Sequence, residues 1–236
     1  MKERMTRRGS VDLIYDPFYE ILQDPDDDWA FRPGQLFYSH IAYPETHPQI
    51  LKMIKYDPRN ERNTTFAISP YSDGDEKHYP VKELKLREGE LFYVYKGKRR
   101  LVVVLGRVES GWFKDNPQEY LICAPIFTFK PAHNQEMIIK TQGFLYPSLF
   151  YMSPDINGCP EESAIRFEMI QPVIRNCLDP FFCYGEKKPV CLSQDAYWIL
   201  LCHLLKFLNG KILDQKTEEY MKFYGEYLME GFIENP

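Results

Sequence analysis

The sequence predicts a mainly β protein of the α+β kind, and two observations carry that prediction. Between Arg32 and Arg175, short runs of β-branched and aromatic residues alternate with Pro, Gly, Asn or Asp. This spacing is typical of a small antiparallel barrel or sandwich. From Ser193 onward the apolar residues recur at helical spacing instead. No βαβ pattern is visible, so a parallel α/β sheet is not expected.

The candidate strands divide the chain into four segments. We expect an N-terminal arm (1–30), an N-terminal β segment (31–86), a barrel (87–178) and a C-terminal helical region (179–236). The candidate strands are Gln35–Ile41, Ile50–Tyr56, Thr64–Ser69, Val81–Leu86, Glu90–Tyr95, Leu101–Val108, Tyr120–Phe129, Met137–Thr141 and Ala164–Ile170.

Two similar stretches suggest that the N-terminal β segment is a partial repeat of the barrel. Arg32–Tyr38 reads Arg-Pro-Gly-Gln-Leu-Phe-Tyr, and Arg87–Tyr93 reads Arg-Glu-Gly-Glu-Leu-Phe-Tyr. Two copies of a seven-residue β pattern also arise by chance, and repeat architectures usually show three or more units. Duplication and coincidence therefore both stay open.

The C-terminal region predicts a helical hairpin. Ser193 is a good N-cap, Asn209-Gly210 is a good helix stop, and the residues between them are apolar on most sides. We therefore expect a buried helix over Ser193–Leu208. A second helix is predicted over Asp214–Glu230, which carries one broad aromatic face.

Composition narrows the function classes. The 236 residues are 44% hydrophobic, enough for a core, and the net charge of −5 excludes a basic footprint over the whole chain. A local basic patch stays open, because acidic residues gather at Asp24–Asp28. No P-loop or nucleophile elbow is present, which disfavours nucleotide hydrolysis and serine-hydrolase chemistry.

The sequence also predicts a cytoplasmic protein without a membrane span. No run of about 18 apolar residues and no secretory signal is found. The six cysteines form no Cys-x-x-Cys pair, so we expect reduced thiols. A zinc site can be imagined from Cys177, Cys183, Cys191, Cys202 and His203. Their spacing matches no standard zinc motif, so no metal or other cofactor is predicted.

A basic stretch within Arg87–Gly106 is the strongest candidate for chemistry. A strand, a tight loop containing Lys96, Lys98, Arg99 and Arg100, and a continuous apolar strand follow one another. We expect a hairpin that holds its arginines on a rigid rim, where guanidinium groups can bind phosphate. The alternative is a solvated turn with no ligand.

Four blocks of the chain resemble the PemK/MazF family of bacterial toxins. They resemble, in order, the family's opening strand, its arginine-containing strand, its third strand and its late acid-Ser strand. The blocks are Gly89–Val94, Arg99–Gly106, Leu121–Thr128 and Glu162–Val173. The resemblance covers about a third of the chain. It implies a small Src-homology-like β-barrel, often dimeric, here with an N-terminal β extension and the C-terminal helical hairpin.

The resemblance also implies an activity, the metal-independent cleavage of single-stranded RNA. The family's catalytic arginine falls on Arg100, where the following proline is replaced by Leu101. The family's catalytic threonine falls on Phe127, or on Thr128 if the alignment slips by one residue, which would turn the side chain to the other face of the strand. An antitoxin is the expected partner.

Three further residues are candidate substrate contacts. Lys98 and Arg99 stand beside Arg100, and His133 lies in a polar loop after the third strand. A loop histidine is more often simply exposed.

Three hypotheses follow. The chain is a toxin-type endoribonuclease, a catalytically inactive barrel that binds nucleic acid or protein, or a structural member of an assembly. The first requires Arg100 and a hydroxyl or imidazole to face one cleft. The third predicts a large exposed apolar patch on the C-terminal helices.

Overall fold

The computed structural model describes residues 17–22, 31–43, 49–72, 82, 84–87, 90–108, 119–130, 133–154, 161–182, 188–212 and 214–233. This part of the chain is mainly β with antiparallel sheets, as predicted, and contains three α-helices. The strands are β1 (Tyr19–Ile21), β2 (Leu36–Tyr43), β3 (Gln49–Lys55), β4 (Thr65–Pro70), β5 (Tyr93–Val94), β6 (Lys96–Val108), β7 (Tyr120–Thr128), β8 (Leu149–Met152), β9 (Ser163–Arg166), β10 (Gln171–Ile174), β11 (Asp179–Pro180) and β12 (Val190–Leu192). The helices are α2 (Gln135–Gln142), α3 (Gln194–Asn209) and α4 (Gln215–Ile233), with 3-10 turns at Glu61–Asn63, Phe167–Met169 and Arg175–Cys177.

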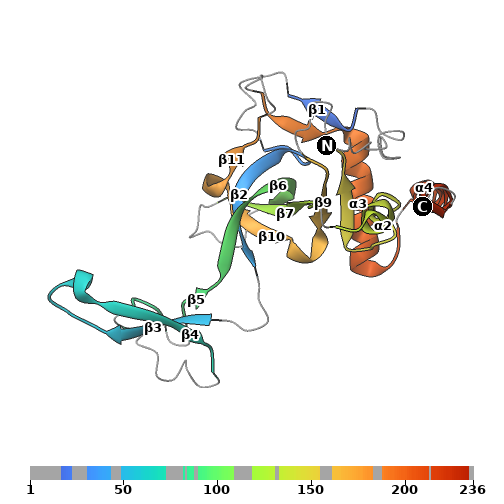
Figure 1. Cartoon of the computed structure of the whole chain (residues 1–236). Coiled ribbons are helices and arrows are strands. Elements are labelled where there is room, and N and C mark those ends of the chain that lie inside the picture. The colour runs from blue at the N-terminus through green and yellow to red at the C-terminus, as the bar shows by residue number, and fades with distance from the viewer. Residues whose placement is uncertain are drawn as a thin grey trace, which may run out of the picture. The chain divides into compact units, whose positions relative to one another are not determined.

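The largest sheet is built around β7. Its strand order is β11-β2-β6-β7-β9-β8 (Figure 1), and β10 also pairs with β7. β9 and β10 pair with successive parts of β7, since Ile126 lies opposite Ile165 and Cys123 lies opposite Gln171. The path of the described strands is open, and no closed barrel is found among them.

The pair β6–β7 lies in the core, as its continuous apolar runs predict. Val102, Val103 and Val104 are buried, and Val103 lies opposite Ala124 on β7. Burying side chains of this size stabilises the fold by about 1.5–3 kcal/mol each. The predicted adjacency of these two strands is therefore confirmed.

The hairpin predicted for Arg87–Gly106 is wrong. Lys96–Val108 is one continuous strand, and Tyr93–Val94 pairs with β3 instead. On the side away from β7, the partner of β6 is β2, and backbone hydrogen bonds join Gly34 and Gln35, which lead into β2, to Val104 at 2.7 and 3.0 Å. Gly97 lies inside this strand, where a Cβ would stand 3.3 Å from the Ile41 carbonyl oxygen. Glycine here serves a close backbone approach and not a turn.

Two other predicted strands are wrong. The region of Met137–Thr141 is the helix α2, because the Asn134 side chain caps it by accepting from Glu136 N at 3.0 Å. A Glu136–Lys140 ion pair of 2.6 Å adds i,i+4 support. Within Val81–Leu86, Lys82, Leu84 and Lys85 lie in turns instead, and Lys85 has a φ of 57°.

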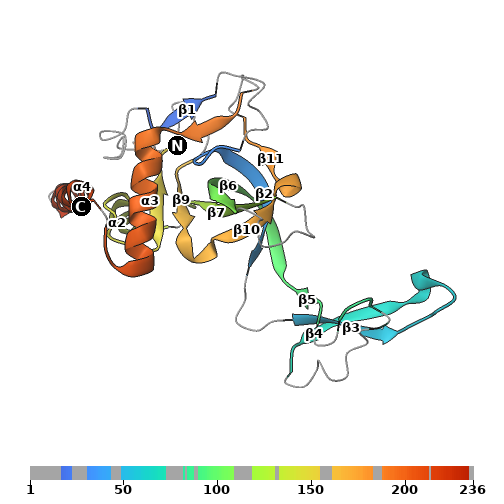
Figure 2. The same ribbon diagram turned by 180° about the vertical axis from the view of Figure 1, so that it is seen from behind.

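Both C-terminal helices are confirmed. The Ser193 side chain caps α3 by accepting from Ala196 N, and Gly210 ends the helix in the left-handed region with φ 73°. Ala196, Ile199 and Leu200 of α3 enter the main hydrophobic cluster. Figure 2 shows the helices gathered at one end of the sheet.

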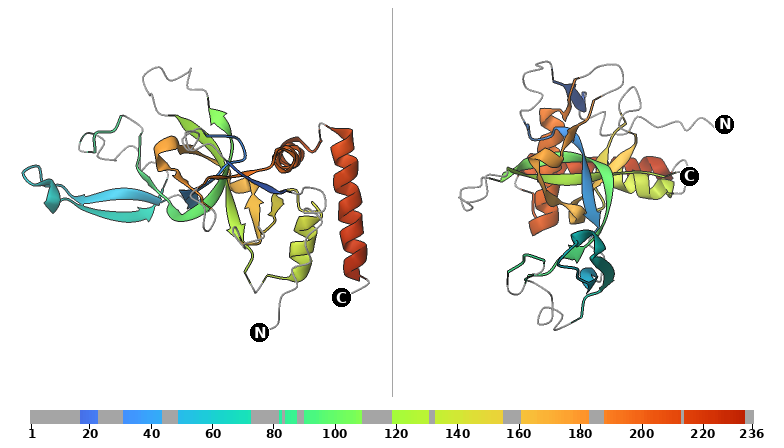
Figure 3. Two further views of the ribbon diagram at one scale, coloured as in Figure 1. Left: turned by 90° about the horizontal axis from the view of Figure 1, so that it is seen from above. Right: turned by 90° about the vertical axis from the view of Figure 1, so that its left-hand side faces the viewer.

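The last helix, α4, packs on α2 (Figure 3, left). The backbones meet at two glycines, where a Cβ on Gly225 would lie only 2.7 Å from the Gly143 carbonyl oxygen. Thr217, Met221 and Gly225 form the buried side of α4. None of the described helices is both long and apolar enough to cross a membrane.

The chain divides into two compact units, residues 1–40 with 99–236, and residues 41–98. The first contains the whole hydrophobic cluster. The second contains a three-stranded sheet of order β4-β3-β5. The two similar stretches differ in environment, because Phe37 is buried and Phe92 is 43% exposed.

Candidate nucleic-acid interface

The Arg100 guanidinium lies over the Phe127 ring, 4.3 Å from its centroid. Two residues further along β6, Val102 lies opposite Pro125 of β7, so Arg100 and Phe127 project from the same face of this strand pair. Cation–π contact and the strand backbone together hold the guanidinium in one place.

A second arginine shares the same ring. Arg166, at the end of β9, has its guanidinium carbon 5.1 Å from the Phe127 centroid. β9 is the neighbour of β7 on the side away from β6. Arg166 also donates from Nε and Nη2 to Glu168 Oε1, at 2.8 and 2.6 Å. Three adjacent strands thus place two cations on one aromatic residue, a set named here the arginine face (Arg100, Phe127 and Arg166).

The structure does not join Arg99 to this face. Arg99 stacks on Tyr38 of β2 at 4.5 Å and pairs with Asp179 of β11 at 3.0 Å. Neighbouring residues of a strand point to opposite sides, which separates Arg99 from Arg100. The exposed Lys98 precedes them in β6 and belongs to the 41–98 unit.

Thr128 and His133 have other surroundings. Thr128 is exposed, lies opposite Ser163 of β9 and follows Phe127 directly, so it projects from the opposite face of β7. His133 Nδ1 accepts from Lys130 N at 2.5 Å, and its ring meets the Phe129 ring edge-on at 5.8 Å. His133 thus closes the turn that leads into α2.

These positions determine what the arginine face can do. Two guanidinium groups held on one aromatic ring can donate to phosphate oxygens. Cleavage of RNA at the 2′-hydroxyl also needs a proton acceptor and a proton donor. The catalytic threonine that the resemblance implies faces away from Arg100, so the structure does not place it beside the guanidinium groups.

Thiol nucleophiles are disfavoured in the core. Burial raises the pKa of Cys123 and of Cys191 to about 12, so both thiols stay protonated at neutral pH. Within the described ranges, no group of three or more His, Cys, Asp or Glu residues is placed to hold a metal ion.

A row of exposed tyrosines lies in the 41–98 unit. Tyr93 and Tyr95 stack at 6.3 Å, and the Tyr71 ring lies 6.2 Å from Tyr93. Residues 93 and 95 are about half exposed. Such rows accept stacked bases in many single-strand binding proteins.

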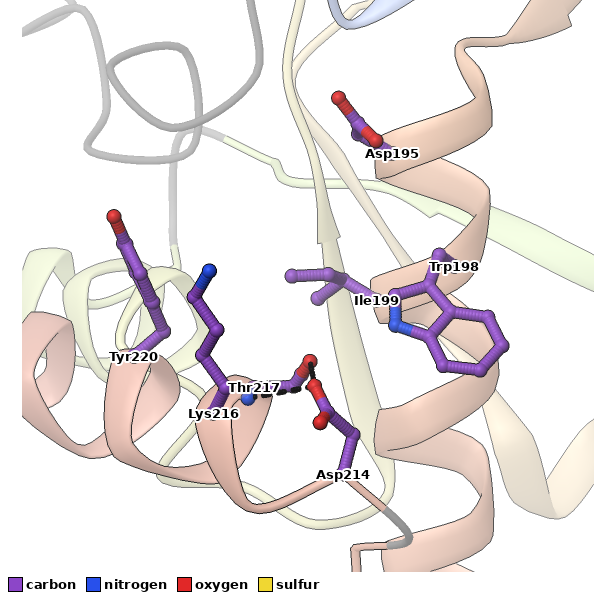
Figure 4. A pocket seen from close by; sticks show the side chains of 7 residues that line it. All are labelled: Asp195, Trp198, Ile199, Asp214, Lys216, Thr217 and Tyr220. Carbon is purple, nitrogen blue, oxygen red and sulfur yellow. Dashed lines mark hydrogen bonds between the residues drawn. The ribbon is translucent and has the colours of Figure 1, made fainter.

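A pocket of about 250 Å³ lies between α3 and α4 (Figure 4). Trp198 and Ile199 of α3 and Lys216 and Tyr220 of α4 line it, and Ile199 points from α3 toward α4. Asp214 stands at its base, where it caps α4 by accepting from Thr217 N at 2.9 Å. The hydrogen bonds that Asp214 accepts from the Thr217 hydroxyl and from Thr217 N hold the pKa of Asp214 below its usual value.

The sequence predicts Arg100 as a phosphate contact, but it gave no prediction for Arg166. The signal for Arg166 was its place in the fourth block, two residues beyond the residue that pairs with Phe127. Only the pairing of β7 with β9, far apart in sequence, brings Arg166 next to Phe127.

No protein-family model matches this chain, and no curated protein is significantly similar to it.

Proposed function

We propose that this chain binds single-stranded RNA through the arginine face, as a binding module that does not cleave its ligand. The observation that carries the proposal is the placement of two guanidinium groups on the single ring of Phe127. Phosphates would lie on Arg100 and Arg166, which the Phe127 ring holds in place.

A PemK/MazF-type barrel is the finer fold that we propose for residues 87–178. In its support, the blocks that resemble the second, third and fourth family strands fall on β6, β7 and β9–β10, and these strands pair with one another. Nuclease activity is the competing function on this fold. It is weakened by Leu101 in place of the family's proline and by the outward position of Thr128.

The test is fluorescence anisotropy with a labelled 20-nucleotide oligo(U) RNA in EDTA, over a range of salt concentrations. We expect Arg100→Ala and Arg166→Ala each to weaken binding about tenfold, a loss of about 1.4 kcal/mol. Each should also lower the salt slope, by about 0.7 per lost phosphate contact. Arg107→Ala is the matched control, because Arg107 lies on the same strand but seven residues away from Arg100, where it pairs with Glu119 at 2.6 Å.

Denaturing gels of the same mixtures separate the two functions. Intact RNA after long incubation supports a binding module. Cleavage in EDTA that is lost in both Arg100→Ala and Thr128→Val would establish the nuclease instead. If the wild type, Arg100→Ala and Arg107→Ala bound RNA with equal affinity, the arginine face would not be the RNA-binding site.

A further inference from the structure

The outer side of α4 carries a row of exposed aromatic side chains. Tyr220, Phe223 and Tyr227 are 47%, 62% and 57% exposed. Phe223 and Tyr227 stack at 6.5 Å, and Tyr220 stacks on Tyr224 at 6.1 Å. These spacings of three and four residues put the row along one side of the helix.

Packing among the described residues does not account for this row. The residues of α4 that meet α2 lie on the other side, at Thr217, Met221 and Gly225. Across the pocket, Trp198 of α3 is 49% exposed as well. We name Trp198, Tyr220, Phe223 and Tyr227 the C-terminal aromatic face. An apolar surface of this kind typically marks a protein contact.

Carboxylates border the C-terminal aromatic face along one side of α4 and at the pocket. Glu219, Glu226 and Glu230 are exposed and stand four, three and seven residues from Phe223, so they flank it along the helix. Asp195 and Asp214 line the pocket, against the single ammonium group of Lys216.

We propose that the C-terminal aromatic face binds a basic amphipathic helix of a partner protein. Apolar side chains of that helix would lie along Phe223 and Tyr227. Its lysines or arginines would meet the flanking glutamates and enter the pocket, where indole and phenol rings and two carboxylates favour a cation. This inference does not depend on the RNA proposal, since it concerns different residues and a different ligand.

The acidic border also argues against two other occupants. A second copy of the chain would bring the same glutamates against one another, and like charges in contact oppose association. An anionic lipid surface would meet the same repulsion.

The test uses two synthetic 20-residue helices as probes. One carries leucine on one face and lysine on the other, and its twin carries glutamate in place of lysine. We expect the full chain to bind the lysine peptide at least tenfold more tightly, as measured by anisotropy of the labelled peptide. The double substitution Phe223→Ser/Tyr227→Ser should weaken that binding at least tenfold. The double reversal Glu226→Lys/Glu230→Lys should do the same.

Two control variants separate this surface from general stickiness. Ile54→Ser removes an equally exposed apolar side chain from β3, where Ile54 is 67% exposed. Glu20→Lys/Glu161→Lys makes the same change of net charge at two other exposed positions. Both controls should bind the lysine peptide as the wild type does, and circular dichroism should show all variants folded.

Three outcomes would overturn the proposal. They are equal binding of the lysine and glutamate peptides, loss of binding in the controls as large as in the test variants, or no binding of the lysine peptide at low salt. Sedimentation of the free protein could give a fourth outcome that overturns the proposal. A dimer that dissociates in Phe223→Ser/Tyr227→Ser would show that a second copy covers the face.

Discussion

His203 is held uncharged inside a cage of aromatic rings. Its Nε2 lies 3.1 Å from the Tyr146 oxygen and 3.0 Å from the Leu149 oxygen, so Nε2 is the protonated nitrogen. Phe144 and Phe167 rings lie at 5.5 Å from the imidazole. Burial, assisted by the charge of Lys206, lowers the pKa of His203 to about 4.

The depressed pKa makes stability depend on pH in one direction. Below about pH 6.5 the unfolded chain binds a proton that the folded chain excludes, so the free energy of unfolding falls as pH drops from 6.5 to 4. The full effect is about 3 kcal/mol. We expect His203→Gln to lose this contribution, as measured by urea unfolding at pH 7 and pH 4.5. An unchanged pH slope in the variant would contradict the assignment.

At this same scale, sequence predicted part of the candidate site. Arg100 does precede the buried residues Val102–Val104, but it lies within the strand β6 and not in a loop, and its neighbours were not predicted. Arg99 and Arg100 are adjacent in sequence and yet contact Asp179 and Phe127, on different strands. The choice of neighbour depends on strand alternation and on pairing far along the chain, which a local motif does not contain.

Among the elements, the docking of α4 depends on glycine at position 225. We expect Gly225→Ala to detach α4 from α2, because the new Cβ would meet the Gly143 oxygen at 2.7 Å. The intrinsic helix preference for Ala, about 1 kcal/mol over Gly, acts in the opposite direction. Hydrogen exchange should therefore show faster exchange in α4, by tenfold or more, and unchanged protection in β6 and β7.

The control for that prediction is Gly106→Ala. An added Cβ at Gly106 meets no atom within 4 Å, so the same chemical change should leave α4 protected. Slower exchange of α4 in Gly225→Ala would show that helix propensity outweighs the contact.

Elements with strong local signals were predicted well. α3 has a Ser cap, an apolar body and a Gly stop, and its bounds agree with the prediction. β6 and β7 were evident from continuous apolar runs. α2 was mistaken for a strand because Met137, Ile138 and Ile139 form a short apolar run that fits either period, and the capping role of Asn134 was the deciding signal.

On the scale of the whole molecule, the main cluster takes all its residues from the 1–40 and 99–236 unit. Within 41–98, Ile41 and Ile50 are the buried apolar residues of the described part. We therefore expect a chain in which Asn-Gly replaces residues 44–95 to fold cooperatively, with a melting temperature no lower than that of the full protein, because the shorter loop costs less closure entropy. Calorimetry checks this, and loss of a cooperative transition would show that 41–98 supports the core.

This arrangement lay beyond sequence reasoning for a physical reason. β6 was expected to pair with the strand just before it, because short connections are the commonest. On that side, β6 instead pairs with β2, which ends at Tyr43, far from Lys96 in sequence. Hydrophobic period identifies a strand and the face it buries, but it does not identify a distant partner.

The close approach of Gly97 to Ile41 also has an entropic consequence. It makes residues 44–95 a single closed loop on a pair of strands. Loop-closure entropy grows only with the logarithm of length, so extending a two-residue turn to about fifty residues costs roughly 3 kcal/mol. None of the described side chains of this loop belongs to the main cluster, so that cost is the chief thermodynamic effect of the loop's length on the cluster. The tip of β2 and β6 is thus a position where segments of very different size can be accommodated without altering the core.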